Sequence, residues 1–562
     1  MKLLYNYYYI INPFYNSNQI NFEVKLMFEN FDINDKFESY KITLLESKKY
    51  WLIYLGLILI TCLSTVTSQN FAHPKFELIM FVIVAIIGIF CIVYYFRHNN
   101  DKELYKVAFV VIVCFGLICS LILPVCEVSD ETEHITRAEI TSHGVIFPHW
   151  TGEDLGLTRT YNITDGDKME GLNRGAGYYV PQGMFFFYND FGKTVFTTPH
   201  DTDKINYTPA IWYSAFEQNP FFGYLPQAVG IAIAKLLDLN IIWMMWLGRI
   251  GNLLCYAGLI SYAIKKTPYL KIPLLAVACI PLTLYQASSI SIDSMIFGLG
   301  ILAVAYFIYM IKSPKDSLDN KEIGIFTLIC LLLGLCKLPY LAFIFLLILV
   351  PKDNFKDKHN YIKLILISVL GVAIIGLMWS NYSTPTLLHS WRSYLFDVNS
   401  TAQAQYFLKN PPMILEFIKH IFTVDLWTVI TGVFNFYSGG TPNHHYEDHY
   451  ILITILIELF LAFILFIYPR EVKFDKKTKI GVILIMLIIY IGTCTIQLLT
   501  WSPVGKIRPG VSIRYFIPLV ALIPILAGLP KKYMKKEIDY YSIVLIIGFM
   551  ATLILAFATK YY

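Results

Sequence analysis

Long apolar runs recur along this chain from Trp51 to the C-terminus, and they constrain its fold more than any other feature. A run of about 20 apolar residues can cross a bilayer as a helix. Because lipid offers the backbone no hydrogen-bond partner, such runs must be helical. Hydrophobic residues make up 56% of the chain and charged residues only 15%, against about 25% charged residues in soluble proteins. The sequence therefore predicts an all-α polytopic membrane protein.

We expect about thirteen transmembrane helices and one re-entrant or interfacial helix. Their orientation follows from the loops, because short loops rich in lysine and arginine stay in the cytosol. Alternate loops carry the positive charge, beginning with Lys48 and Lys49. We therefore place the N-terminus in the cytosol and expect multi-pass insertion in the plasma membrane. The predicted spans are 51–68, 77–96, 106–125, 243–264, 271–288, 293–312, 323–336, 339–350, 361–379, 451–468, 479–499, 515–529 and 541–558.

The same pattern divides the chain into successive regions. The first 50 residues lack the apolar core and cleavage site of a signal peptide, so we expect a cytosolic tail. Whether the chain starts at Met1 or at Met27 is left open. The predicted regions are the tail at 1–50, three spans at 51–126, a large outer loop at 127–221, spans with the re-entrant segment at 222–379, a second large outer loop at 380–450 and the last spans at 451–562.

Two apolar segments do not fit a simple alternation of spans. A full span at 221–239 would move the basic loop 265–271 to the outer side, so we predict a re-entrant or interfacial helix there. For the same reason, residues 331–350 must form two short helices broken near Lys337 and Pro339. A broken helix within a membrane usually lines a polar cavity.

Four acids, a histidine and an arginine crowd the segment SDETEHITRAE at 129–139, directly after the third predicted span. If this segment is helical, Asp130, His134 and Arg137 lie on one face at the level of the lipid headgroups. The alternative is an ordinary helix start, with Asp130 as the N-cap and Glu133 as its capping-box partner. The residues alone leave both interpretations open.

Basic side chains elsewhere complement this acidic segment. Lys337 lies in an apolar run, where a charge costs about 3 kcal/mol or more and needs a partner or a wet cavity. Snorkelling to the membrane surface is its alternative role. Arg514 lies on the predicted outer side, where positive charge is least expected, and arginine matches phosphate oxygens.

Weaker candidates lie on the other predicted outer loops. A tight serine-rich turn ends in an aspartate, although a capped helix start explains it equally well. The second outer loop holds an aromatic-basic pair and the run NHHYEDHY, whose spacing matches no defined metal site. Metal dependence is therefore left open. The candidates for a cavity or an acceptor site are Ser288, Ser291, Asp293, Trp391 and Arg392.

The order of these motifs resembles that of a family of polytopic membrane proteins, catalogued as domain of unknown function two-one-four-two (DUF2142). The resemblance covers roughly residues 105–530, and the chain departs from it at Ile513, where the family usually has glycine. The matching elements are DE..H..RA at 130–138, YLPQA at 224–228, R..N at Arg249 and Asn252, P....QASS.S.D at 281–293, K.PY at 337–340 and RYF.P at 514–518.

That family is similar to the GT-C superfamily of integral membrane glycosyltransferases. The resemblance implies a GT-C-like fold and inverting transfer of a sugar from a polyprenyl-phosphate donor to a glycan, lipid or protein acceptor on the outer face. It implies catalytic roles for Asp130 (the preferred base), Glu131 (the second choice), His134 and Arg137. The residues that it implies for binding the donor phosphate are Lys337, Arg249 and Arg514.

Two other classes of protein stay open. A transporter or flippase for lipid-linked glycans also needs a cationic cavity and a broken helix, but not a carboxylate pair at one surface. If the protein were a non-catalytic membrane scaffold, the charge of Lys337 within an apolar run would have no explanation. Membrane lipid is an expected partner of every class, and nucleic acid is not, because the basic residues lie in short loops between apolar runs.

Overall fold

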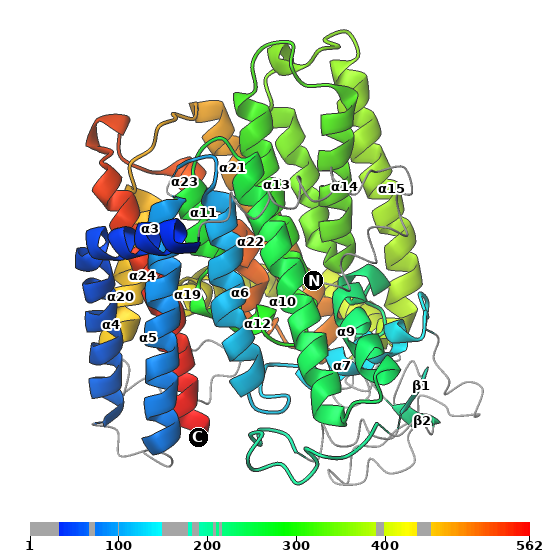
Figure 1. The fold of residues 1–562 in the computed structure, drawn as a ribbon. Helices are drawn as coiled ribbons and strands as arrows, with labels where there is room; N and C mark the ends of the chain where they lie inside the picture. The colour runs from blue at the N-terminus through cyan, green and yellow to red at the C-terminus, as the bar shows by residue number, and fades with distance from the viewer. Residues whose placement is uncertain are drawn as a thin grey trace, which may run out of the picture.

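The computed structural model describes residues 33–66, 74–98, 100–148, 178–181, 190–205, 209–212, 216–388, 398–434 and 451–562. In this part, the chain forms a bundle of helices whose long axes run between two ends (Figure 1). A two-stranded antiparallel sheet of β1 (Tyr178–Pro181) and β2 (Pro209–Trp212) lies at the lower end in that view.

Seven helices of the described part are long and apolar enough to cross a membrane, which confirms a membrane protein with several apolar helices. Two of them, α13 and α24, are enclosed by their neighbours, with 83% and 94% of their most apolar stretches buried. The seven are α5 (Pro74–Arg97), α6 (Leu104–Ile122), α10 (Ile241–Lys266), α13 (Asp293–Lys312), α15 (Tyr361–Leu388), α21 (Lys476–Trp501) and α24 (Lys536–Tyr561).

The first predicted span forms α4 (Lys48–Val66), which has 19 residues, as many as α6. The remaining predicted spans form shorter elements, so the count of thirteen stays a prediction. Prolines divide several of them, since proline suits a first helical turn and ends the helix before it; Pro281, Pro518 and Pro524 each lie at a helix start. The shorter elements are α11 (Lys271–Ala278), α12 (Pro281–Ala287), α14 (Asn320–Cys336), η3 (Leu338–Leu349), α20 (Ile451–Ala462), η7 (Phe463–Ile467), η8 (Ile513–Phe516), α22 (Ile517–Val520) and α23 (Ile523–Leu526).

Helices also occupy both segments that were predicted as large outer loops. The second loop begins later than predicted, because α15 continues to Leu388, and four helical segments follow it. The remaining helices are α3 (Ile33–Glu46), α7 (Glu131–Ser142), η2 (Phe221–Gly223), α9 (Leu225–Leu236), η4 (Lys352–Asn354), α17 (Ser400–Lys409), α18 (Pro411–His420), η5 (Ile421–Asp425), α19 (Leu426–Phe434) and η9 (Lys531–Tyr533).

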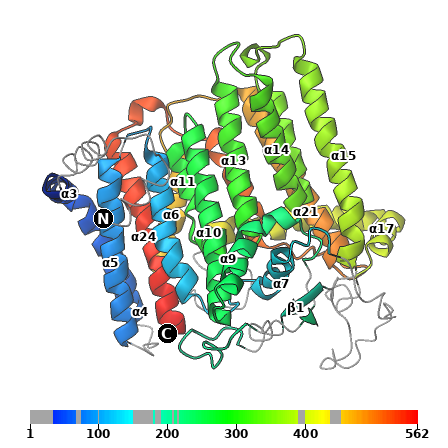
Figure 2. The same ribbon diagram turned by 45° about the vertical axis from the view of Figure 1, so that its right-hand side comes forward.

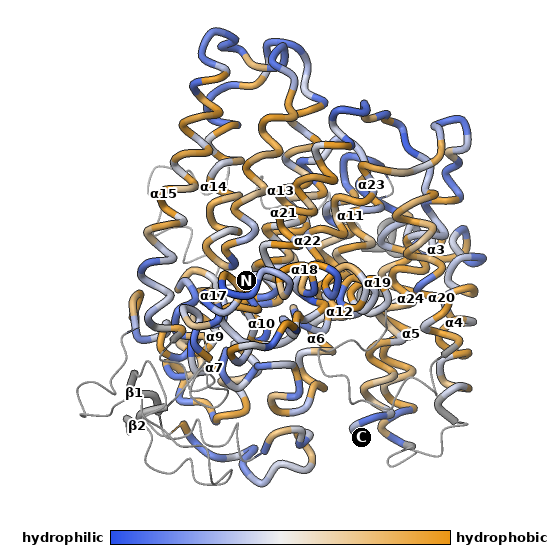
Figure 3. The backbone as a smooth tube through the Cα atoms, turned by 180° about the vertical axis from the view of Figure 1, so that it is seen from behind, coloured by the Kyte–Doolittle hydropathy of each residue, from blue (hydrophilic) through white to orange (hydrophobic). Residues whose placement is uncertain are grey.

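The basic loops gather at one end of the bundle. Lys266 Nζ lies 3.0 Å from Glu322, and Lys312 donates to the carbonyl of Lys473 at 2.8 Å, so loops distant in sequence meet there. The other end holds α7, both strands and the C-terminus (Figure 2). Hydrophobic residues fill the helices between these ends, and hydrophilic residues concentrate in the end loops (Figure 3). This arrangement agrees with the predicted alternation of loops; which end faces the cytosol stays a prediction.

The predicted break at Lys337 is present. Helix α14 ends at Cys336, Lys337 is extended with φ −155° and ψ 108°, and η3 begins at Leu338. The chain turns back on itself here, so that Leu341 packs against Gly334, where a Cβ atom would lie 2.1 Å from Leu341 Cδ2 and 3.0 Å from its Cα. Thus α14 and η3 form a hairpin whose turn carries Lys337.

The segment after the first outer loop is also shorter than a span. Helix α9 has 12 residues, or about 18 Å at 1.5 Å per residue, whereas the hydrocarbon core is about 30 Å thick. It packs closely on α10, since a Cβ atom on Gly230 would lie 2.0 Å from the Leu247 carbonyl oxygen. The prediction that 221–239 is not a full span is therefore confirmed.

The predicted orientation can be tested by cysteine labelling. With the ten native cysteines replaced, Lys204→Cys in the first large loop should react with a membrane-impermeant maleimide in intact cells. Lys315→Cys in a basic loop should react only after permeabilisation, because positive loops stay inside. Both native side chains are exposed, at 64% and 77%. The opposite pattern of labelling would show that the orientation is inverted.

Candidate functional site

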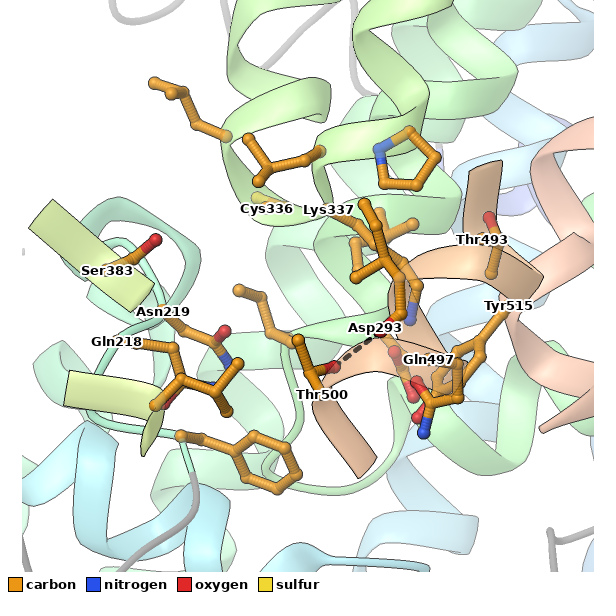
Figure 4. A pocket seen from close by; sticks show the side chains of 18 of the residues that line it. Gln218, Asn219, Asp293, Cys336, Lys337, Ser383, Thr493, Gln497, Thr500 and Tyr515 are labelled. Carbon is orange, nitrogen blue, oxygen red and sulfur yellow. Dashed lines mark hydrogen bonds between the residues drawn. The ribbon is translucent and has the colours of Figure 1, made fainter. Parts of the chain in front are cut away.

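A cavity of about 160 Å³ lies beside the Lys337 turn, between helices α15 and α21 (Figure 4). Its wall is assembled from seven separate segments of the chain, which are brought together only by the tertiary fold. The polar residues on the wall are His134, Gln218, Asn219, Asp293, Lys337, Ser383, Thr493, Gln497, Thr500, Arg514 and Tyr515.

The Arg514 guanidinium joins two carboxylates from distant segments. Its Nη2 donates a hydrogen bond to Asp130 Oδ2, and its Nη1 donates to the carbonyl of Ser129 at 3.1 Å. Its Nε lies 3.0 Å from Asp293 Oδ2, an ion pair without hydrogen-bond geometry. The Arg514 side chain is only 4% exposed. Arg514, Asp130 and Asp293 therefore form one buried charge cluster.

Asp130 holds this position through an uncommon backbone conformation. It occupies the N-cap position of α7 with φ 64° and ψ 13°, and its side chain makes no capping hydrogen bond. The capping-box interpretation is therefore wrong. A left-handed residue other than glycine costs about 1–2 kcal/mol, although aspartate tolerates this region better than most residues. The carboxylate that a cap would have used pairs with Arg514 instead.

Lys337 lies on the cavity wall with its charge over an aromatic ring. Its Nζ is 3.0 Å from the centre of the Tyr515 ring, a cation–π contact. Within the described residues, Lys337 forms no ion pair. The hydroxyl of Tyr340 donates to the backbone carbonyl of Tyr515. The K.PY and RYF.P motifs therefore hold each other in place.

His134 and Arg137 lie on the same face of α7, as predicted, and both contact the loop before α9. His134 Nδ1 is 2.6 Å from the Tyr224 hydroxyl, and its ring stacks on Phe216 with centroids 4.3 Å apart. Arg137 is fully buried and donates twice to the carbonyl of Asn219, at 3.2 Å each. Arg137 therefore fixes one wall of the cavity rather than lining it.

Glu131 and Arg249 form a second buried ion pair, away from the cavity wall. Both are fully buried, and their atoms meet at 2.8 Å (Nε to Oε1) and 2.7 Å (Nη2 to Oε2). The amide of Ile290 also donates to Glu131 at 2.9 Å. All five N–H groups of Arg249 are used, since the others donate to the carbonyls of Ser120, Leu123 and Pro124. This pairing supports a structural role for both residues.

The turn before α13 rests on a buried hydrogen-bond network. Gln227 Nε2 donates to Asn252 Oδ1 at 2.8 Å and to the carbonyl of Ser291 at 3.0 Å, and Asn252 donates to the carbonyl of Ser289 at 2.7 Å. Ser291 Oγ accepts from the amide of Asp293 at 3.1 Å. The YLPQA, R..N and QASS motifs thus converge to place Asp293 on the cavity wall.

A further clamp connects α7 to α9. Glu139 is buried and accepts hydrogen bonds from Lys235 Nζ and from His143 Nε2, the latter at 2.9 Å. Burial opposes ionisation of this carboxyl, but the hydrogen bonds and charges of His143 and Lys235 outweigh it and lower the pKa of Glu139. The clamp keeps α7 against the membrane-level helix α9.

The remaining predicted site residues lie elsewhere. Ser288 donates to the carbonyl of Gly116 at 3.3 Å, inside the protein. Trp391, Arg392 and the run NHHYEDHY fall outside the described residues. Within the described part, no three His, Cys, Asp or Glu side chains are arranged to hold a metal ion.

Sequence reasoning missed the uncharged part of the cavity wall. Gln218 and Asn219 lie in a loop without a recognised motif, and Ser383 follows a predicted span. Gln497 could have been recognised as a cavity residue from the sequence, because an amide side chain within an apolar span needs a hydrogen-bond partner or a wet cavity.

The described part of the chain is a bundle of apolar helices, seven of which are long enough to cross a membrane, with a charged cavity near one end. These are the features of a polytopic integral membrane protein. The chain belongs to the family described as "Predicted membrane protein (DUF2142)", whose model matches residues 113–523. The matched part contains the whole cavity wall. No curated protein and no solved structure matches the chain.

The buried Glu131–Arg249 pair should be essential for stability. Glu131→Gln leaves the Arg249 charge buried without its partner, so it should destabilise the protein by about 3–5 kcal/mol. A lower thermal midpoint of the purified protein in detergent would show this loss. The double variant Glu131→Gln/Arg249→Met should lose less than the sum of the two single variants. An exposed control, Glu38→Gln, should melt as the wild type does; a wild-type midpoint for Glu131→Gln would contradict the structural role.

Proposed function

We propose that this protein is an integral membrane glycosyltransferase that moves a sugar from a polyprenyl-phosphate donor to a glycan, lipid or protein acceptor on the outer face. The observation that carries the proposal is the Lys337 ammonium, which lies on the cavity wall and makes no ion pair within the described residues. A charge that has lost much of its hydration inside a membrane protein is stabilised by a counter-ion. A lipid phosphate is an anion available at that depth.

The cavity suits an amphipathic ligand of this kind. Its wall holds the charged side chains of Lys337 and Arg514 together with apolar side chains such as Leu335, Leu387 and Ile496. A phosphate at the charged wall leaves the isoprenoid chain among apolar helices. A flippase would need the same cations, but it gives no role to the two carboxylates on Arg514. We therefore favour transfer over transport.

The charge cluster supplies the groups that the reaction needs. Asp293 lines the cavity wall, and Asp130 borders it through Arg514. We assign the general base to Asp130, because its side chain is 15% exposed, against 6% for Asp293. Asp130 removes the proton of the acceptor hydroxyl while that oxygen attacks the anomeric carbon. The bond from this carbon to the phosphate oxygen breaks with inversion, and the lipid phosphate leaves. Lys337 and Arg514 stabilise the charge that grows on the phosphate.

Arg514 and Asp293 have supporting roles in this mechanism. Arg514 orients Asp130 through its charged hydrogen bond. Asp293 offsets part of the Arg514 charge from the other side. His134 lies on the wall close to Tyr224, where it can orient the acceptor hydroxyl. The proposal as a whole is tested by profiling the glycans and lipid-linked sugars of cells with and without this protein.

Asp130→Asn should abolish sugar transfer while the protein still folds, because the shape is kept and the base is lost. We expect a loss of at least about 100-fold, measured as transfer by purified protein from a polyprenyl-phosphate sugar. Asp353→Asn, on the opposite end of the bundle, should transfer as the wild type does. If Asp293→Asn loses transfer and Asp130→Asn keeps it, Asp293 is the base. If both variants stay active, the glycosyltransferase proposal fails.

Lys337→Met should raise the apparent KM for the polyprenyl donor and leave that for the acceptor nearly unchanged. Losing one charged contact to phosphate corresponds to about 1.5–3 kcal/mol, or about ten- to hundredfold. Lys337→Arg should keep part of the affinity, since it keeps the charge. Lys315→Met at the basic end serves as the matched control. An unchanged donor KM in Lys337→Met, with normal thermal stability, would exclude the phosphate role.

A further inference from the structure

The two loops that lead into α21 and α24 lie side by side at the basic end of the bundle. The amide of Arg470 donates to the carbonyl of Leu529 at 3.0 Å, and the amide of Leu529 donates to the carbonyl of Ile467 at 3.2 Å. Arg470 and Pro530 also form a parallel β-bridge. These backbone contacts join the segment 470–479 to the segment 529–539, so two stretches that are distant in sequence form one surface.

This surface holds the net positive charge of the whole protein. The two segments contain nine basic and four acidic residues, a net charge of +5, and the complete chain also has a net charge of +5. Two of the four acids are already engaged, since Asp475 accepts from the amide of Thr478 at 3.1 Å and Asp539 accepts from the Tyr468 hydroxyl. All seven lysines in 473–477 and 531–536 are exposed, and they are here called the lysine patch.

The lysine patch differs from the other basic loops in its lack of internal counter-ions. In the described part of the chain, no lysine of the patch forms an ion pair. Each of the other basic loops at this end has at least one lysine that is paired with a carboxylate of the protein. These pairs are Lys106–Glu103 (2.6 Å), Lys271–Asp101 (3.1 Å), Lys315–Asp353 (3.7 Å) and Lys358–Asp316 (2.7 Å).

The position of the lysine patch favours a lipid over a soluble anion. Lys476 begins α21 and Lys536 begins α24, and both helices are long enough to cross a membrane. Lysines directly outside a span lie at the level of the lipid headgroups, where their long side chains reach the phosphates. Apolar side chains are exposed in the same segments and at the start of α21, with Leu529 39%, Tyr533 48% and Ile480 58% exposed. A soluble polyanion would leave these side chains in water, whereas a membrane covers them.

We propose that the lysine patch is a binding site for anionic phospholipids in the leaflet at the basic end of the bundle. Lysine is a compact point charge that binds phosphate without a fixed geometry, so the site selects negative charge rather than one particular headgroup. The rule that places basic loops in the cytosol requires neither the pairing of these two loops nor the apolar side chains beside their lysines. The inference does not rest on the proposed function, because the patch shares no residue with the cavity wall.

The test measures binding to the delipidated full-length protein in a neutral detergent by native mass spectrometry. The probes are phosphatidylglycerol, phosphatidylcholine and glycerophosphoglycerol, which is the headgroup of the first lipid without its acyl chains. We expect phosphatidylglycerol to bind at least about tenfold more tightly than either of the other two probes. Equal binding of the two lipids would overturn the proposal. Glycerophosphoglycerol that binds as tightly as phosphatidylglycerol would show a site for free phosphate anions and would overturn it as well.

A variant with Lys531, Lys532, Lys535 and Lys536 replaced by glutamine tests the location of the site. It should bind phosphatidylglycerol at least about tenfold more weakly, bind phosphatidylcholine as the wild type does and keep its thermal midpoint, since these four side chains are exposed.

The matched control makes the same change at four exposed lysines of other basic loops, Lys315, Lys321, Lys352 and Lys356. This control loses the same charge and should keep the wild-type preference for phosphatidylglycerol. An equal loss in both variants would show a general effect of charge, and an unchanged preference in the patch variant would place the site elsewhere; either result would overturn the proposal. If the patch variant does not fold, replacement of the three patch lysines in 473–477 by glutamine gives the same test.

Discussion

The buried ion pair between Glu131 and Arg249 fixes the part of the structure on which the cavity depends. Arg249, from the middle of the sequence, joins the end of α6 to the start of α7 through carbonyl and carboxylate contacts. Glu131 also accepts from the amide of Ile290, which ties the turn before α13 to the same point. Because Asp130 directly precedes Glu131, this pair determines where the Asp130 carboxylate can reach. The Glu131–Arg249 pair has no direct role in the proposed reaction, but it positions the neighbouring Asp130 beside Arg514.

Interruptions of the helices create the cavity itself. In a membrane, unbroken helices satisfy their own backbones, and a break is tolerated where the freed backbone is buried in protein or lines a polar cavity. The extended residue Lys337 follows the end of α14 at Cys336, and Pro339, in the first turn of η3, has no amide hydrogen to continue the helix. The same break brings Lys337 over the ring of Tyr515, whose backbone carbonyl accepts a hydrogen bond from the Tyr340 hydroxyl. The single break at Lys337 therefore contributes to the cavity and also places the Lys337 ammonium on its wall.

The charged groups of the cavity suit the phosphate of the proposed ligand, whose charge grows as the sugar leaves. Arg137 connects the charge cluster to the loop before α9, because its helix α7 follows Asp130 and its guanidinium donates to the carbonyl of Asn219. Through this contact, the loop that carries Gln218 and Asn219 is positioned by the same helix that begins at the charge cluster.

The sequence by itself determined the membrane class, the alternation of basic loops and the break at Lys337, because hydrophobic length, charge and proline act locally along the chain. The same local signals named Asp130, Lys337 and Arg514 as candidates. They did not separate Asp130 from Glu131, which are adjacent in sequence yet pair with different arginines. They also gave no notice of Gln218, because it lines a cavity whose wall comes from seven separate segments. Only the tertiary structure decided these assignments, since the partner of a buried charge and the space in front of an amide depend on residues that are far away in the sequence.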